Sequence, residues 1–116
     1  MKFKLIIATV TDERTEDVMK RARSMGATGA TVITSARGEG MKPPKSFFGI
    51  TVEGQVDVLM FIVEQHMARS IMEGIAESGN FETVKGAGVV FQLDIEDVMG
   101  IGSQIEAIKE ELEDEL

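Results

Sequence analysis

Residues 3–11 read FKLIIATVT, a run of apolar and β-branched residues that predicts a β-strand. Residues 12–26 follow with apolar residues at helical spacing, and Gly26 stands where a helix often ends, so this segment predicts a helix. A second strand is expected at residues 29–35. The chain therefore begins with a strand–helix–strand unit.

The same order of elements returns 53 residues further on. Residues 56–63 predict a third strand, residues 67–78 a second helix that ends at Gly79, and residues 87–95 a fourth strand. Two such units in tandem predict an α+β fold of the ferredoxin-like type, βαββαβ, with a four-stranded antiparallel sheet and both helices on one face. The glycines and prolines of residues 37–49 argue against regular structure between the two units.

Composition excludes several classes of protein. The chain has 116 residues, 43% of them hydrophobic, which predicts a single domain with a buried core. It has no Cys, which excludes disulfides, thiolate zinc sites and a cysteine nucleophile. The longest wholly apolar run, residues 58–63, is far shorter than the roughly 20 residues of a membrane span. No secretory leader is recognisable, so we expect a cytoplasmic protein without direct membrane insertion.

The negative charge is concentrated near the C-terminus. The formal net charge is −8, and −5 of it lies in residues 104–116. We expect a domain at residues 1–101 and a short acidic helix or tail at residues 102–116, with an apolar stripe through Ile105 and Ile108. This tail is either a solvated surface helix or a segment that docks a partner or inhibits the domain. An acidic chain without a basic stripe argues against nucleic-acid binding.

The expected strands are apolar on both of their faces. The first strand places Leu5 and Ile7 on one face and Ile6 and Ala8 on the other, and the third strand has the same character. Two helices on one side of a sheet cover only one face, and soluble monomers rarely expose an apolar face of several hundred Å². The sequence therefore predicts a homo-oligomer whose subunits press their open sheet faces together.

Two glycine-rich segments, residues 37–42 and residues 85–88, are candidate phosphate-binding loops. Glycines free backbone N–H groups to surround a phosphate, and Arg37 or Lys42 supplies positive charge. An ordinary flexible turn explains the same composition, and both interpretations stay open.

The loop between the two units also carries Lys45, Phe47 and Phe48. Aromatic and cationic side chains on a loop are typical of a partner-binding hot spot, although the rings can equally pack against the base of the loop. His66 is the only His, with no second His or Cys to complete a zinc site. No catalytic set of Ser, His and Asp is recognisable, so we expect a protein that is not an enzyme.

The runs Gly26-Ala-Thr-Gly-Ala-Thr-Val32, Arg37-Gly-Glu-Gly40 and Gly86-Ala-Gly88 resemble the PII nitrogen-regulatory signalling proteins over about residues 1–100. The resemblance implies a ferredoxin-like homotrimer with inward-facing sheets. It also implies adenine nucleotides bound as effectors in clefts between subunits. A long mobile loop, here about residues 38–54, would engage a target protein such as a metabolic enzyme, a membrane transporter or a regulator.

The resemblance also implies the residues of the site. Those implied to contact the nucleotide are Ile7, Gly29, Thr31, Gly38, Gly40, Lys42, Phe61, Gly86 and Gly88, and those expected to contact the target are Lys45, Phe47 and Phe48. The family has a Lys where this chain has Val89, and an Arg-x-Arg pair where it has Val98-Met-Gly-Ile101. Losing these charge-assisted contacts to phosphate predicts AMP or ADP as the effector in preference to ATP. Without Tyr, the family's tyrosine nucleotidylation switch cannot operate.

The alternative is a ferredoxin-like trimer that binds a metal or a metabolite without sensing a nucleotide. A single His and the absence of Cys weigh against soft metals in such a protein.

Overall fold

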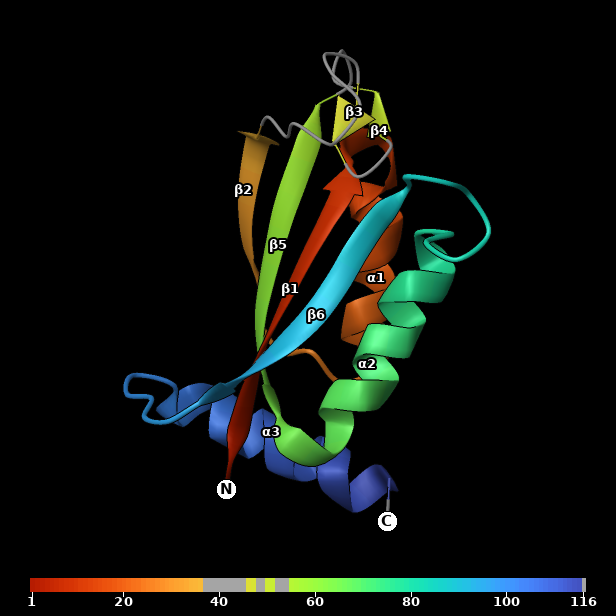
Figure 1. The fold of residues 1–116 in the computed structure, drawn as a ribbon. Coiled ribbons are helices and arrows are strands. Elements are labelled where there is room, and N and C mark those ends of the chain that lie inside the picture. Colours follow the sequence, from red (N-terminus) through yellow and green to blue (C-terminus); the bar gives the residue numbers. More distant parts are fainter. Residues whose placement is uncertain (37–45, 48–49, 52–54, 116) are drawn as a thin grey trace.

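The computed structural model of the chain describes residues 1–36, 46–47, 50–51 and 55–115 (Figure 1). Its elements are, in order, β1 (Phe3–Thr11), the short 3-10 helix η1 (Asp12–Arg14), α1 (Thr15–Ser24), β2 (Thr31–Ala36), β3 (Ser46–Phe47), β4 (Ile50–Thr51), β5 (Val56–Glu64), α2 (Gln65–Ser78), β6 (Gly88–Ile95) and α3 (Gly102–Glu115).

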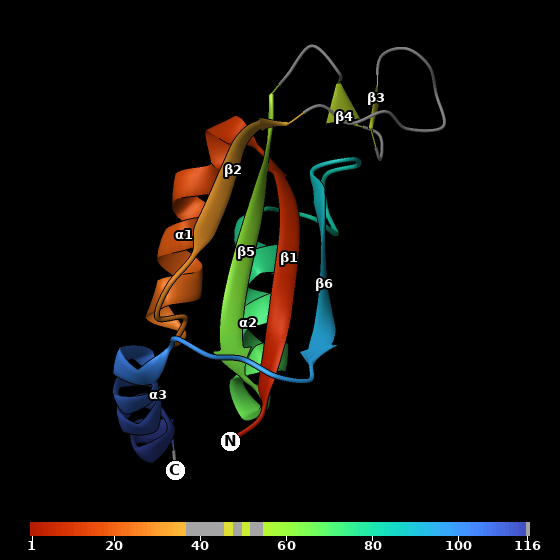
Figure 2. The same ribbon diagram turned by 90° about the vertical axis from the view of Figure 1, so that its left-hand side faces the viewer.

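Four strands form one antiparallel sheet in the order β2-β5-β1-β6. Helices α1 and α2 lie on the same side of this sheet (Figure 2). Both strand–helix–strand units are present, which confirms the ferredoxin-like prediction. Strand β1 has the bounds that its sequence predicts, whereas α2 begins two residues earlier than expected. It begins there because the Glu64 side chain accepts a hydrogen bond from the backbone N–H of His66 at 2.8 Å and caps the helix.

The face of the sheet that α1 and α2 cover holds the main core. In β1 and β5 the side chains on this face are almost completely buried, and the helices contribute small and branched residues to the same cluster. The members of the core from the two strands are Ile6, Ala8, Val10, Leu59, Phe61 and Val63, and those from the helices include Val18, Ala22, Ala68, Ile71 and Ile75. This alternation along the strands follows the period of two of a β-strand.

The opposite face of the sheet is also apolar, and no described helix covers its centre (Figure 2). We call it the open face. It carries Ile33 from β2, Val58, Met60 and Ile62 from β5, Leu5 and Ile7 from β1, and Val89, Phe91 and Leu93 from β6. Ile33 is 49% exposed, Phe91 42% and Leu93 48%. The structure therefore contains the two apolar faces that the sequence predicts, one covered and one open.

The acidic tail forms α3, which crosses the end of the sheet near the N-terminus (Figure 1). Ile108 is only 1% exposed and packs in a second core cluster with Phe3 and Ile101. Glu106 and Glu110 on the same helix are exposed. Helix α3 is therefore a docked part of the fold with one solvated side.

The prediction that residues 37–49 lack regular structure is wrong at residues 46–47. These residues form β3, which pairs with β4, with Ser46 opposite Thr51 and Phe47 opposite Ile50. In the part of the chain that the structure describes, no helix combines the length and the apolarity needed to cross a membrane.

Candidate functional site

Strands β2 and β6 form the two edges of the sheet (Figure 1). Strand β2 ends at Ala36, which pairs with Val56, immediately before the first glycine-rich segment. Strand β6 begins at Gly88, two residues after Gly86, and Gly88 pairs with Val10. Two strands, β5 and β1, separate these edges, a distance of about 14 Å at the usual strand spacing. Within one chain, the end of β2 at Ala36 and the turn at Gly86 therefore lie at the same end of the sheet but on opposite edges.

The local geometry requires glycine at both Gly86 and Gly88. Gly86 has φ +75°, the left-handed region that other residues avoid. A Cβ on Gly88 would lie 2.4 Å from the carbonyl oxygen of Thr9 and 2.5 Å from the ring of Phe81. The turn that holds them is closed by the N–H of Ala87, which donates to the carbonyl of Val84 at 3.1 Å. This segment is a fixed turn that exposes the preceding side chain of Lys85.

The structure brings together two of the residues implied to contact the base. Ile7 lies opposite Met60 in the sheet, and Met60 lies opposite Thr31, so the three form a row across the open face. Gly29 lies just before this row, on the segment that leads into β2. Phe61 does not join them, because it points to the other face, where it is completely buried.

Several predicted residues fall outside the described part of the chain. They are Gly38, Gly40, Lys42, Lys45 and Phe48. The backbone of Phe47 belongs to β3, while its side chain is not among the described ones.

Apolar side chains occupy the positions where the resembling family has cations. Val89 is half-buried on the open face, opposite Thr9. Val98 and Ile101 pack in the second core cluster, and Met99 between them is 91% exposed. Residues 98–101, which stand where the family has its Arg pair, therefore belong to the segment that connects β6 to α3, and two of them help to pack α3 against the sheet.

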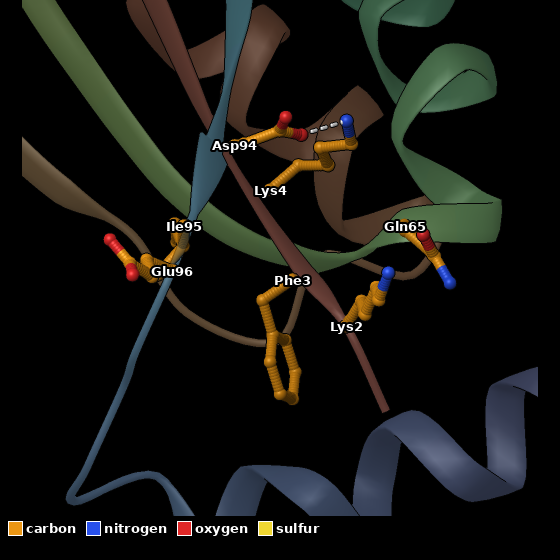
Figure 3. A pocket seen from close by; sticks show the side chains of 7 residues that line it. All are labelled: Lys2, Phe3, Lys4, Gln65, Asp94, Ile95 and Glu96. Carbon is orange, nitrogen blue, oxygen red and sulfur yellow. Dashed lines mark hydrogen bonds and ion pairs between the residues drawn. The ribbon is translucent and has the colours of Figure 1, made fainter.

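A pocket of about 710 Å³ lies at the end of the sheet away from Gly86 and Gly88 (Figure 3). It is lined by Lys2, Phe3, Lys4, Gln65, Asp94, Ile95 and Glu96. The Lys4 ammonium donates a hydrogen bond to Asp94, and this bond and the positive charge of Lys4 lower the pKa of the Asp94 carboxyl. Sequence reasoning missed this pocket, although Lys2 and Lys4 alternate with Phe3 at the start of β1. Two lysines balanced by two acids give it no strong preference for an anion.

Several other polar side chains have partners within the fold. The Thr15 hydroxyl donates to Asp57 at 2.6 Å in the buried contact between α1 and β5. His66 is an exposed residue of the first turn of α2, and its ring contacts the buried carboxylate of Glu64. Among the described residues, no group of three or more His, Cys, Asp or Glu side chains is arranged to hold a metal ion.

Comparison with known proteins identifies what this geometry resembles. The family model described as nitrogen regulatory protein P-II matches residues 3–112. This match extends past residue 101 and includes most of α3. A comparison of the sequence with curated proteins gives no match.

Two solved structures share the fold. One is CPII from Thiomonas intermedia K12 bound to ADP, AMP and acetate, with a TM-score of 0.70 and 20% identity, covering 86% of this chain and 91% of that chain. The other is a PII-like signaling protein from Thermus thermophilus, with a TM-score of 0.60 and 22% identity, covering 82% of this chain and 87% of that chain.

Proposed function

This chain belongs to the P-II family of nitrogen regulatory proteins, and we propose that it is a trimeric signal-transduction protein that senses an adenine nucleotide and regulates a target protein. The observation that carries the proposal is that Ala36, the last described residue before the first glycine segment, and the turn at Gly86 lie on opposite edges of one sheet. A nucleotide that uses groups from both edges would then lie between two copies of the chain.

The open face supplies the reason for assembly. Its nine apolar positions span all four strands, and some of the largest side chains are close to half exposed. A second copy of the same face is an apolar partner of matching chemistry, and burial of apolar surface stabilises the complex by about 25 cal/mol per Å². When the β2 edge of one subunit meets the β6 edge of the next, the contact is head-to-tail, and such contacts close into rings. In a ring of three, each cleft would combine Ile7, Gly29 and Thr31 of one subunit with Gly86 and Gly88 of its neighbour.

An adenine nucleotide is the ligand that we propose for this cleft. The solved CPII structure holds ADP and AMP, and it shares the fold of this chain. Gly38, Gly40 and Lys42 follow the end of β2 in the sequence and would contact the phosphates from one side. We expect AMP or ADP to bind more tightly than ATP, because Val89 and the connecting segment Val98–Ile101 supply no cation to a third phosphate.

Binding of the ligand would change the conformation of the loop of residues 38–54. The ligand would bind one conformation of this loop more tightly than others and so shift the population toward it, without any chemical step. Lys45, Phe47 and Phe48 would then contact the target, which is a metabolic enzyme, a membrane transporter or a regulator. In this role the protein acts in the cytoplasm as a regulatory protein and not as an enzyme.

Calorimetry with AMP, ADP and ATP, combined with the molar mass from light scattering, tests the site. We expect a trimer that binds AMP or ADP and binds ATP more weakly. An intact trimer that gives no heat with any of the three at millimolar concentration would remove the nucleotide from the proposal. The alternative, a trimer that binds a metal or a metabolite, would then be favoured.

A gain of charge at Val89 sharpens this test. We expect Val89→Lys to increase the affinity for ATP by about tenfold or more, the effect of one charge-assisted hydrogen bond, with a smaller effect on AMP. Thr83→Lys adds the same charge at an exposed position outside the proposed cleft and serves as the control. Equal ATP affinities of the two variants, both trimeric by light scattering, would show that position 89 does not face the phosphates.

Capture of partners from a lysate, with and without ADP, tests the loop. We expect the double variant Phe47→Ala/Phe48→Ala to lose partners that the wild type retains, because aromatic anchors dominate such contacts. Equal recovery by both proteins would contradict the assignment of the loop tip.

A further inference from the structure

Helix α3 reaches the proposed base-binding end of the cleft through one side chain, Gln104. The first turn of α3 is anchored at Ile101, which is buried and whose carbonyl accepts from the N–H of Gln104 at 3.0 Å and from that of Ile105 at 3.1 Å. The helix is held further along by Ile108 in the second core cluster. The position of Gln104 is therefore set by the fold on both sides of it.

The amide of Gln104 lies against the segment that leads into β2. The Thr28 hydroxyl donates a hydrogen bond to Gln104 Oε1 at 3.2 Å. A Cβ built on Gly29 would lie 3.4 Å from Oε1 and 3.6 Å from Nε2, so a side chain at this position would contact the amide. Gln104 is half-buried, and it meets Thr28 at the edge where Gly29 and Thr31 are found.

This arrangement leaves a defined set of hydrogen-bonding groups. An amide oxygen accepts two hydrogen bonds, and an amide nitrogen donates two. Thr28 uses one lone pair of Oε1 and thereby restrains the amide. One lone pair of Oε1 and the N–H groups of Nε2 remain for a ligand, side by side.

An acceptor next to a donor is complementary to one edge of adenine. Adenine presents the N6 amino group as a donor beside a ring nitrogen that accepts, and Gln binds this edge with two hydrogen bonds. Guanine presents O6 and N7, two acceptors, on the corresponding edge. Oε1 would then face O6, with two lone pairs opposed and no hydrogen bond between them.

We infer that Gln104 is a specificity-determining residue that pairs with the edge of an adenine base lying on the row of Ile7, Met60 and Thr31. Thr28 is the positioning residue that holds the amide of Gln104 in the required plane. The inference rests on the proposed function, because it uses the same cleft. It assigns to α3 a role in the choice of base, which the tail's acidic composition does not suggest.

The test compares ADP with GDP by calorimetry on the wild type, Gln104→Met and Gln104→Glu. We expect the wild type to prefer ADP, and Gln104→Met to lose about 5- to 150-fold in ADP affinity, the range for a bidentate amide–base pair, with GDP affinity nearly unchanged. Gln104→Glu keeps the shape and the acceptor but loses the donor, so it should lose ADP affinity as well. Thr28→Val should lower the preference for ADP by a smaller factor.

Glu106→Gln, an exposed exchange on the same helix, is the control and should leave both affinities unchanged. Thermal unfolding and hydrogen exchange at residues 104–112 check that α3 stays docked in each variant. If Gln104→Met undocks the helix and Gln104→Glu does not, the wild type is compared with Gln104→Glu. Equal ADP-to-GDP ratios in the wild type and in a docked Gln104 variant would overturn this inference alone. Wild-type protein that binds neither nucleotide would overturn the proposed function, and this inference with it.

Discussion

The two faces of the central sheet have nearly the same composition and very different surroundings. On one face, Ile6 and Phe61 are completely buried under α1 and α2. On the other face, Ile7 and Met60, their neighbours in sequence, are half-buried and have no described helix above them. Covered apolar surface stabilises the folded chain, whereas uncovered apolar surface is available to stabilise an assembly. Strands β1 and β5 therefore each contribute to two separate equilibria, folding of the subunit and assembly.

The largest expected effect is on the covered face. Phe61→Ala removes a completely buried ring and leaves a cavity, which we expect to lower the free energy of unfolding by roughly 3–5 kcal/mol. Urea denaturation at a fixed protomer concentration measures this change.

Met60→Ala is the matched variant, one residue away and on the open face. We expect it to weaken assembly more than it weakens the folded subunit. If Met60→Ala and Phe61→Ala lowered unfolding stability equally without affecting the molar mass, the distinction between the two faces would fail.

The next effect concerns assembly. Phe91→Asp places a charge on the β6 side of the open face, where contact with a second subunit would bury it without a partner. We expect a loss of about 2 kcal/mol or more per contact, the size of an interface hot spot, and a shift from trimer to monomer in light scattering. The circular dichroism spectrum should keep its helical signal, because Phe91 takes no part in the main core.

Glu82→Ala, an exposed substitution outside the sheet, should leave the molar mass of the assembly unchanged. A Phe91→Asp protein that keeps the mass of the wild type would show that the open face is not the contact between subunits.

The sequence predicted the two faces but not which one the helices would cover. Residues 5–8 and 58–63 are apolar at every position, so the pattern alone does not distinguish Ile7 from Ile6 or Met60 from Phe61. The resemblance implied that Ile7 and Phe61 both contact the nucleotide, whereas the register of β1 and β5 places their side chains on opposite faces of the sheet. Pairing register is a tertiary property, because it depends on how the whole strand meets its neighbour.

The C-terminal helix shows a second limit of the sequence. The spacing of Ile105, Ile108 and Leu112 predicted an apolar side, and that side is present. The spacing did not predict which residues the apolar side of α3 packs against, because its partner Phe3 lies about one hundred residues away in the sequence. The contact between Gln104 and Thr28 carries no sequence signal at all, since both residues are ordinary polar side chains.

A smaller effect is expected where α3 covers the end of the sheet. Ile108→Ala removes a buried side chain from a small cluster at the edge of the fold, which we expect to cost about 2 kcal/mol, the lower end of the range for such changes. Because the helix is held mainly by this cluster, its amides should exchange faster with solvent while those of β1 and β5 stay protected.

Ala107→Ser, on the exposed side of α3, is the control. Uniformly faster exchange across the sheet in Ile108→Ala would mean that α3 and the main core unfold together, so that the end of the open face belongs to the same cooperative unit as the covered face.

The smallest expected effect lies where the covered face ends. Lys4 continues the side of β1 that carries Ile6 and Ala8, but there it meets Asp94 at the surface instead of a helix. The hydrogen bond and the charge of Lys4 lower the pKa of Asp94 in the folded protein. A lowered pKa adds stability above the ordinary Asp value of about 3.9, and this stability is lost as the pH falls through the folded pKa.

We therefore expect Asp94→Asn to be slightly less stable than the wild type at neutral pH and equal to it well below about pH 3.9. The difference is small because Asp94 is fully exposed, so water and salt screen the ion pair. Urea midpoints of both proteins at the two pH values measure it, and Asp97→Asn, an exposed acid without a salt bridge among the described residues, is the control. A difference between wild type and Asp94→Asn that does not change with pH would assign the effect to the strand rather than to the ion pair, and the covered face would then be stabilised by its apolar side chains alone.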